Sequence, residues 1–150
     1  SASGLYKEMK IDLTKYPYLN WSWKIGSRLK PADETQKSGD DYVARVYVVI
    51  SGGLFFWETK ALNYVWSSTS QTGKVWPNAF AGSNAQMMSI RSNRDDVNIW
   101  YAEKRNVFED LKSVFGEFFQ YIDGIAIMTD TDNTKGKATS YYGDIYFSAE

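Results

Sequence analysis

Strict alternation of apolar and polar side chains is the feature that most constrains the fold of this chain. Its clearest instance spans positions 19–25, where Leu19, Trp21, Trp23 and Ile25 alternate with polar or charged residues. Successive side chains of a β-strand point to opposite faces, so this spacing predicts a half-buried strand with both indoles in the core. Similar patterns predict strands at 5–13, 61–68, 84–92, 97–104, 121–128 and 140–148.

Two segments depart from this pattern. Residues 41–51 are apolar on both parities, which predicts a central strand covered on both faces. Residues 107–115 instead show a helical stripe. Asn106 precedes it, Glu109 follows Asn106 at the spacing of a capping box, and Gly116 ends the stripe. We therefore predict one short helix. The polar stretches at 26–40 and 71–83, which contain proline and glycine, are expected to be loops.

About eight short strands with turn signals between them, and no alternation of strands with helices, indicate an all-β protein. We predict an antiparallel β-sandwich of jelly-roll type with one short helix, and a closed barrel as the alternative. The 150 residues suit a single domain spanning 1–150. Patterned sequence begins close to Ser1 without an initiator methionine, so we expect a processed or truncated product that lacks N-terminal strands.

The composition excludes several chemistries. The chain has no histidine and no cysteine, which removes histidine-based nucleophilic relays, thiolates, iron–sulfur clusters and structural zinc from its own repertoire. Any metal would be a hard cation held by oxygen atoms. Lys and Arg number 17 against 18 Asp and Glu, so the chain offers no basic excess for nucleic acid. No apolar run approaches the length of about 20 residues that a transmembrane helix needs.

A polar turn at 129–136 is the strongest candidate for a metal site. Asp130 and Asp132 can present two carboxylates on one side of an extended turn, and Asn133 adds a carbonyl oxygen. Asp144 joins them if its strand pairs with the preceding one. The predicted ion is calcium, although the pattern is not an EF-hand, and a hydrogen-bonded turn between two strands explains the same residues.

A second group of residues is predicted to bind a ligand. Asp41 and Arg45 share a strand face beside Asp40, which indicates either a structural ion pair or the lining of a ligand groove. Glu103 could pair with Asp40, Asp41 or Asp130 as in a glycosidase. Flat aromatic rings suit the apolar faces of sugars, and Trp76, in a loop beside a proline, is expected to be exposed. The complete set of predicted ligand-binding residues is Trp76, Asp40, Asp41, Arg45, Asn63 and Glu103.

Apolar residues also gather at 54–57, where Trp57 follows Leu54, Phe55 and Phe56. This stretch is interpreted as a hydrophobic loop tip that either covers the core or contacts a partner. Most other aromatic residues, Trp21 and Trp23 among them, are assigned to the core because aromatic side chains are common core residues of strands.

Several runs together carry a family resemblance: 19–24 (LNWSWK), 39–48 (GDDYVARVYV), 61–66 (ALNYVW), 103–107 (EKRNV), 124–134 (GIAIMTDTDNT) and 142–147 (YGDIYF). The chain resembles the bacterial family named domain of unknown function 3047 over nearly its whole length. The resemblance implies an exported, periplasmic or secreted protein with a galactose-binding or concanavalin-like sandwich, and further residues upstream. It implies no activity.

The favoured hypothesis is a non-catalytic module that binds a glycan or another small ligand. Two alternatives stay open: an enzyme that acts on saccharides through carboxylates, and a structural or partner-binding domain completed by strands from another chain.

Overall fold

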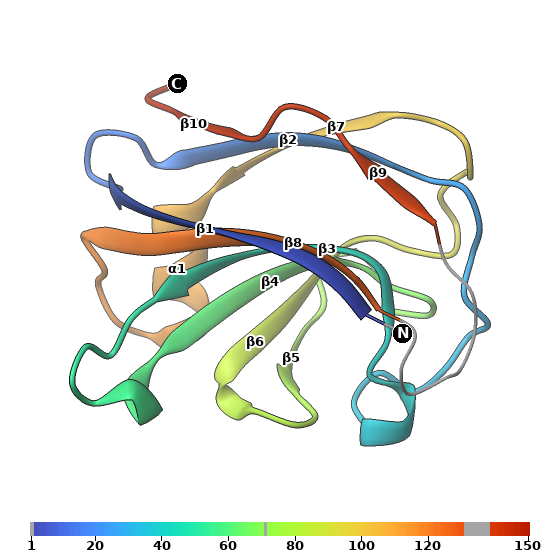
Figure 1. Ribbon diagram of the computed structural model, residues 1–150, viewed down its shortest axis with the longest axis horizontal. Coiled ribbons are helices and arrows are strands. Elements are labelled where there is room, and N and C mark those ends of the chain that lie inside the picture. Colours follow the sequence, from blue (N-terminus) through green and yellow to red (C-terminus); the bar gives the residue numbers. More distant parts are fainter. Residues whose placement is uncertain (1, 71, 131–138) are drawn as a thin grey trace.

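The computed structural model describes residues 2–70, 72–130 and 139–150, and these fold mostly into β-strands with one short helix (Figure 1). The elements are β1 (Ala2–Asp12), β2 (Tyr18–Ile25), η1 (Lys37–Gly39), β3 (Tyr42–Ile50), η2 (Phe56–Glu58), β4 (Lys60–Trp66), β5 (Val75–Asn78), β6 (Gly82–Arg91), β7 (Tyr101–Asn106), α1 (Val107–Phe115), β8 (Tyr121–Asp130), β9 (Ser140–Tyr142) and β10 (Tyr146–Ser148).

The described strands form two sheets, which lie one above the other (Figure 1). The large sheet has the order β1-β8-β3-β4-β6-β5, and the small sheet consists of β2 with β7 on one side and β9 and β10 on the other. The prediction of a β-rich chain with one short helix is confirmed. The prediction of purely antiparallel pairing is wrong at one place, because β4 and β6 run parallel. The large sheet is therefore mixed.

The main core lies between the two sheets. From the small sheet it receives the apolar face of β2, and from the large sheet the inward residues of β3 and β4. Trp21 and Trp23 are both buried, as their alternation predicted, and their rings meet edge to face with centroids 5.4 Å apart. The indole of Trp23 also packs edge to face on Trp66 of the large sheet, so aromatic contacts join the two layers.

The helix forms where the sequence predicted it. The side chain of Asn106 accepts a hydrogen bond of 3.0 Å from the backbone N–H of Glu109, and Gly116 ends the helix with a left-handed φ of 74°. Val107 and Leu111 carry the apolar stripe into the main core. The helix therefore connects β7 of the small sheet to β8 of the large one and covers part of the core between them.

Three predicted boundaries are wrong, each for a local reason. Residues 75–78 were expected to be loop, but they form β5 at the sheet edge, where Pro77 needs no ladder hydrogen bond. The strand expected from 97 begins at Tyr101, because Asn98 adopts a left-handed φ of 61°. The strand expected at 140–148 is divided into β9 and β10.

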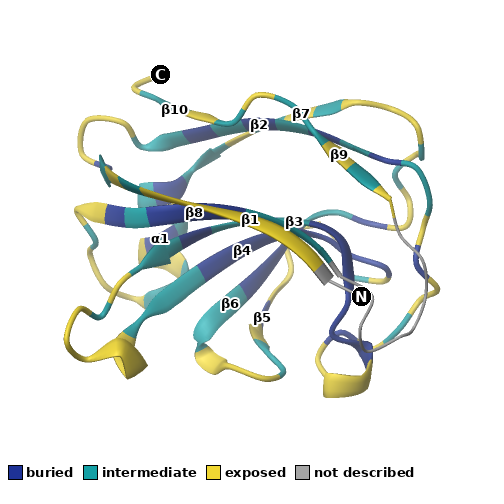
Figure 2. Cartoon of the chain, viewed as in Figure 1, coloured by how far each residue is buried: buried dark blue, intermediate teal, exposed yellow. Residues whose placement is uncertain are grey.

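Strand β1 forms one edge of the large sheet, and much of it is exposed (Figure 2). Met9 and Ile11 pack against the core as predicted, whereas Leu5 is largely exposed. Beside it, pockets of about 380 and 180 Å³ open along β1 and β8, lined by residues that include Leu5, Ile127 and Ile145. Additional strands, as the sequence led us to expect, would add along this side; that expectation stays a prediction.

Candidate ligand-binding face

An irregularity in β3 turns Arg45 onto the outer face of the large sheet. The register between β3 and β8 shifts between Tyr42 and Arg45, and the two residues inside the shift, Val43 and Ala44, both lie in the main core. Tyr142 holds this place, because its hydroxyl accepts a hydrogen bond from Arg45 N (2.9 Å) and donates one to Met128 O (2.8 Å). Such bulges commonly redirect a side chain.

A row of residues crosses the outer face of the large sheet, on the side away from the small sheet. Residues opposite each other on paired strands share a face. The register of the ladder from β1 through β8, β3, β4 and β6 to β5 therefore defines what we call the cross-sheet row: Tyr6, Ala126, Tyr47, Asn63, Met87 and Trp76.

The half of the cross-sheet row on β4, β6 and β5 is buried. Trp76 packs with Tyr42, Val65 and Met87 in a small second core. Its indole N–H donates a hydrogen bond of 3.3 Å to the hydroxyl of Tyr42, and only 4% of the residue is exposed. The expected exposure of Trp76 is therefore wrong, because its segment joins the sheet edge as β5 instead of forming a loop. In this position Trp76 stabilises the outer face of the large sheet by packing within the second core.

Polar side chains lie next to this second core. The guanidinium of Arg45 lies over the rings of Tyr42 and Tyr47, at 5.7 and 5.5 Å from their centroids. Asn78 Nδ2 donates to both oxygens of Asp40 at 3.4 and 3.5 Å. The side-chain oxygen Oδ1 of Asn78 accepts hydrogen bonds from two backbone N–H groups of its own turn. These bonds fix the side-chain amide with its nitrogen toward Asp40.

Burial shifts the pKa values of Asp40 and Tyr42 beside the second core. It raises the pKa of Asp40 above the ordinary value, and the charge of Arg45 acts in the opposite direction, as do hydrogen bonds with Tyr42 and Asn78. Burial also raises the pKa of Tyr42, with the negative charges of Glu34 and Asp40 adding to the effect. The Tyr42 hydroxyl therefore stays neutral and available as a hydrogen-bonding group.

The half of the cross-sheet row on β1, β8 and β3 is open. The ring of Tyr6 lies over Gly124, because a Cβ atom built on this glycine would be 2.7 Å from Tyr6 Cε1. More than half of Tyr6 is exposed, and Tyr47 lies on the other side of Ala126. The pKa of Tyr6 is raised, first by burial and then by the negative charges of Glu8 and Asp123. An aromatic ring, small residues and the carboxylate of Glu8, which is paired with Gly124, thus share this surface.

The structure brings most of the predicted ligand-binding residues together. Asp40, Arg45, Asn63 and Trp76 belong to the outer face, and Asp41 is buried beside Asp40. Asn63 lies in the cross-sheet row between Tyr47 and Met87, and its Nδ2 donates to the backbone oxygen of its neighbour on β6 at 3.3 Å.

Glu103 is the exception, because the structure places it apart from the other predicted ligand-binding residues. It lies in β7 of the small sheet, where Arg91 donates to both carboxylate oxygens at 2.8 and 3.0 Å. Trp23 Nε1 donates to the same carboxylate at 2.7 Å. A carboxylate held by three donors joins the sheets. It does not face the other predicted ligand residues, and it lines a pocket of about 340 Å³ on the small sheet.

The predicted calcium ligands do not form one group among the described residues. Asp130 is opposite Tyr42 in the large sheet, whereas Asp144 lines a pocket of about 340 Å³ with Asn20 and Tyr146 of the small sheet. The strands around Asp144 pair with β2 and not with β8. The pairing that would have brought Asp144 to the predicted calcium site is therefore not present. Asp132 and Asn133 lie outside the described residues, and no group of three Asp or Glu suited to a metal occurs within them. Calcium stays a prediction.

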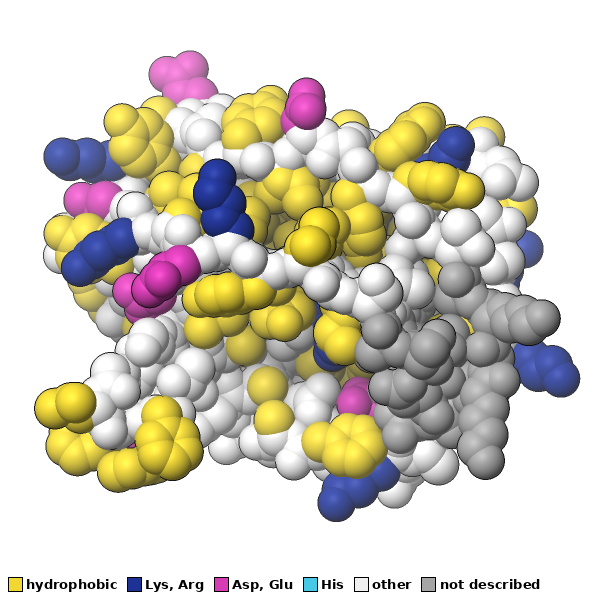
Figure 3. Space-filling model, in the orientation of Figure 1, with side chains coloured by type: hydrophobic (Ala, Val, Ile, Leu, Met, Phe, Trp, Pro, Cys, Tyr) yellow, Lys and Arg dark blue, Asp and Glu magenta, His cyan; other side chains and the backbone are white. Residues whose placement is uncertain are grey.

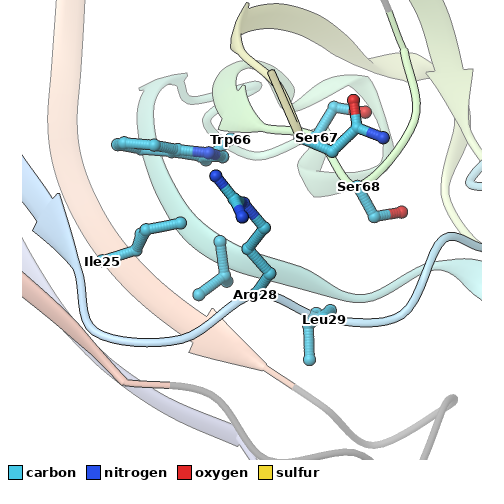
Figure 4. A pocket seen from close by; sticks show the side chains of 8 residues that line it. Ile25, Arg28, Leu29, Trp66, Ser67 and Ser68 are labelled. Atoms are coloured by element: carbon cyan, nitrogen blue, oxygen red, sulfur yellow. The ribbon is translucent and has the colours of Figure 1, made fainter. Parts of the chain in front are cut away.

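A cavity at the end of β2 is too small for a ligand (Figure 4). It measures about 10 Å³, room for one water at most. Its lining includes Ile25, Arg28 and Trp66, and Ser67 and Ser68 form another part of its wall. Arg28 is anchored by a hydrogen bond of 2.7 Å from Nη2 to the backbone oxygen of Asp95.

The buried carboxylate of Glu34 fixes the wall of this cavity. It accepts hydrogen bonds from the hydroxyl of Ser67 and from the backbone N–H of Ser68, the latter at 2.9 Å. Burial raises the pKa of Glu34 despite these bonds. We therefore assign Glu34 a structural role, which is to hold the loop before β3 against the loop after β4.

Sequence reasoning missed Tyr6, Glu8 and Gly124. The signal was present in part, since Tyr6 and Glu8 share the polar parity of the first strand. Nothing in the sequence shows that this parity faces Gly124, which lies more than a hundred residues away and meets β1 only through the β1–β8 ladder.

The pH dependence of stability tests the environment of Asp40. Because the pKa of Asp40 is raised, the folded state holds the Asp40 proton more tightly than the unfolded chain does. The stabilisation from the protonated carboxyl is complete below the ordinary aspartate pKa. It is lost as the pH rises through the raised pKa of the folded state. Relative to the parent, Asp40→Asn should therefore gain stability as the pH rises above the ordinary aspartate pKa of about 4. Urea unfolding at a series of pH values measures this difference.

Asp33→Asn is the control for that measurement. Hydrogen bonds from the side chain and backbone of Thr35 lower the pKa of exposed Asp33, so the stabilising effect of its carboxylate is lost as the pH falls. The stability of Asp33→Asn relative to the parent should therefore change with pH in the direction opposite to that of Asp40→Asn. Equal slopes for the two variants would contradict the assignment.

A known protein family matches this chain. The model of the family described as "Protein of unknown function (DUF3047)" matches residues 1–146. No curated protein matches the sequence. Within the described part of the chain, no helix has the length and apolar character needed to span a membrane.

Proposed function

We propose that this chain, which belongs to the DUF3047 family, is a non-catalytic module that binds a carbohydrate on the outer face of its large sheet. One observation carries the proposal: the exposed ring of Tyr6 lies over Gly124, and the ring of Tyr47 lies across Ala126 from it. The Cα atoms of the two tyrosines are two strand spacings, roughly 10 Å, apart.

The chemistry of this face suits a sugar. A pyranose has an apolar C–H face, which packs on an aromatic ring, and a rim of hydroxyl groups, which need both donors and acceptors. Tyr6 and Tyr47 supply the rings, and the small side chains between them leave the surface flat. Glu8 provides acceptor oxygens beside Tyr6, and the guanidinium of Arg45 lies over Tyr47. These groups support binding without requiring a deep cavity.

We further propose that the two sheets form a sandwich of the galactose-binding or concanavalin-like type and that the protein is exported to the periplasm or secreted. The family resemblance supports both proposals. The catalytic alternative loses support, because the carboxylate of Glu103 is bound by Arg91 and Trp23.

Replacement of Tyr6 by alanine tests the binding face. In affinity electrophoresis through gels containing soluble polysaccharides, the parent should be retarded by at least one of them. Tyr6→Ala should bind that polysaccharide about tenfold more weakly, because the stacking surface is lost. Gly124→Ala should weaken binding as well, since its Cβ displaces the Tyr6 ring.

The matched control is Tyr146→Ala. Tyr146 is as exposed as Tyr6 (55% against 56%) but belongs to the small sheet. Its variant should bind like the parent. Equal binding by the parent and Tyr6→Ala, or no retention of the parent on any polysaccharide of a broad panel, would reject the proposal.

A further inference from the structure

The loop between β3 and β4 exposes a compact apolar surface. Four consecutive large residues are between 55% and 94% exposed there, and we call them the aromatic tip: Leu54, Phe55, Phe56 and Trp57. In Figure 3 hydrophobic side chains gather at the lower left, where Figure 1 places η2. Single exposed apolar residues are ordinary on protein surfaces, but a run of four is not.

The backbone holds the aromatic tip away from the core. Phe55 N donates to Gly52 O (3.1 Å), Glu58 N to Phe55 O (2.8 Å), and Thr59 N to Phe56 O (3.1 Å), so the loop closes on itself. A Cβ atom on Gly52 would be 2.9 Å from the backbone nitrogen of Thr59, so the tight turn needs this glycine. Little freedom remains for the loop to fold inward.

Contacts among the rings add to this rigidity. Trp57 packs edge to face on both Phe55 and Phe56, with centroids 5.3 Å apart in each pair. Asn84 of β6 donates to the backbone oxygen of Trp57 at 2.9 Å and ties the tip to the neighbouring strand. The apolar rings are therefore presented to the surroundings in one arrangement.

The charge pattern limits what can bind the aromatic tip. Residues 50–57 contain no charged side chain. The charges at the base of the loop include Glu58, Lys60 and Asp123, whose carboxylate accepts a hydrogen bond of 2.8 Å from Ser51 N. An ionic partner has nothing to pair with at the tip itself. Binding must come from removing apolar surface from water and should depend little on salt.

The area of the tip favours a lipid surface over a protein. Its four side chains expose on the order of 500 Å², taking 150–250 Å² for each aromatic residue. A stable protein interface needs about 800 Å² from each partner and a complementary shape. A bilayer needs no shape complementarity, and Trp and Phe side chains suit the region between headgroups and acyl chains.

We propose that the aromatic tip inserts into the interfacial region of a lipid bilayer and holds the protein at a membrane surface. The tip lies in the loop that follows β3, outside the cross-sheet row, so membrane contact and carbohydrate binding are separate properties of one molecule. The proposal is also independent of the carbohydrate proposal, and either can fail alone.

Vesicle flotation with neutral phosphatidylcholine provides the test. The parent should float with the vesicles, and raising the salt concentration should not release it. Phe56→Ser should reduce the partition coefficient about tenfold, the effect expected from one phenyl ring. The matched control is Phe118→Ser, since Phe118 is also more than half exposed but follows the helix. Thermal unfolding of both variants confirms that they are folded.

A spectroscopic readout identifies the inserted residue. Phosphatidylcholine brominated on its acyl chains should quench part of the tryptophan emission of the bound parent. Trp57→Phe should keep most of the binding and lose this quenching, because Trp21, Trp23, Trp66 and Trp76 are buried. Trp100 is half exposed, but it lies just before β7 against Lys24 of the small sheet and not at the aromatic tip.

Four results would overturn the proposal. They are absence of the parent from floated neutral vesicles, equal partitioning of Phe56→Ser and the parent, release of the protein by salt, and quenching that persists in Trp57→Phe. Self-association that Phe56→Ser abolishes, without vesicle binding, would assign the tip to a second copy. Loss of polysaccharide binding in Phe56→Ser, without vesicle binding, would assign it to the carbohydrate site.

Discussion

Glu103→Ala should lower the free energy of unfolding by about 3 kcal/mol, the lower end of the range observed when one partner of a buried ion pair is removed, because the Arg91 side chain is one quarter exposed. Glu103 is almost completely buried, and its carboxylate accepts two hydrogen bonds from Arg91 and one from Trp23. The substitution leaves the Arg91 guanidinium without its main counter-charge and the indole N–H of Trp23 without an acceptor. Urea unfolding followed by tryptophan fluorescence measures the loss.

Asp95→Ala is the matched control, because Asp95 is the other carboxylate bound to Arg91. Its bond to Arg91 Nη1 is 3.1 Å long, and its side chain is more exposed than that of Glu103. A loss of about 1 kcal/mol is expected for this more solvated pair. Glu103→Gln keeps an acceptor for Trp23 but not the charge, so its loss of unfolding free energy should lie between those of Glu103→Ala and Asp95→Ala. A Glu103→Ala variant no less stable than Asp95→Ala would show that the pair does not join the sheets.

Trp76→Ala should lower the free energy of unfolding by about 3–5 kcal/mol, the range for truncation of a buried aromatic residue. Trp76 fills the second core with Tyr42, Val65 and Met87, and its loss leaves a cavity on the outer side of the large sheet. The Tyr42 hydroxyl also loses a hydrogen-bond donor. Thermal and urea unfolding measure the change.

Trp76→Phe distinguishes a packing role of Trp76 from direct contact with the ligand. Phenylalanine keeps most of the packing and removes only the hydrogen bond to Tyr42, so a loss of about 1 kcal/mol is expected, together with polysaccharide binding like that of the parent. Loss of binding in Trp76→Phe at nearly parental stability would mean that the indole touches the ligand directly, in contradiction to its buried position.

The local elements of this fold could be predicted from short-range patterns. The alternation at 19–25 placed Trp21 and Trp23 in the core, and the capping box at Asn106 marked the start of the helix. The double-sided apolar pattern at 41–51 identified β3, which lies between β8 and β4. These predictions succeed because strand alternation and helix capping depend on neighbouring residues only.

The candidate site depended on contacts between distant segments. Asp40, Arg45 and Asn63 could be selected as polar residues near apolar strands, but their grouping with Tyr6 requires the β1–β8 and β3–β8 ladders. The bulge that turns Arg45 outward is held by Tyr142, nearly a hundred residues later. Pro77 concealed β5, and with it the burial of Trp76, because a proline in a short segment indicates a loop unless the segment lies at a sheet edge.

By itself the sequence determined that this chain forms strands with one capped helix and that any chemistry of its own excludes histidine and cysteine. Only the tertiary structure decided how distant strands pair and which acidic side chains this pairing brings together. Alternation shows which face of a strand such as β2 is apolar, but strand pairing depends on contacts between segments far apart in the chain. The same contacts paired Glu103 with Arg91 and left Tyr6 exposed over Gly124.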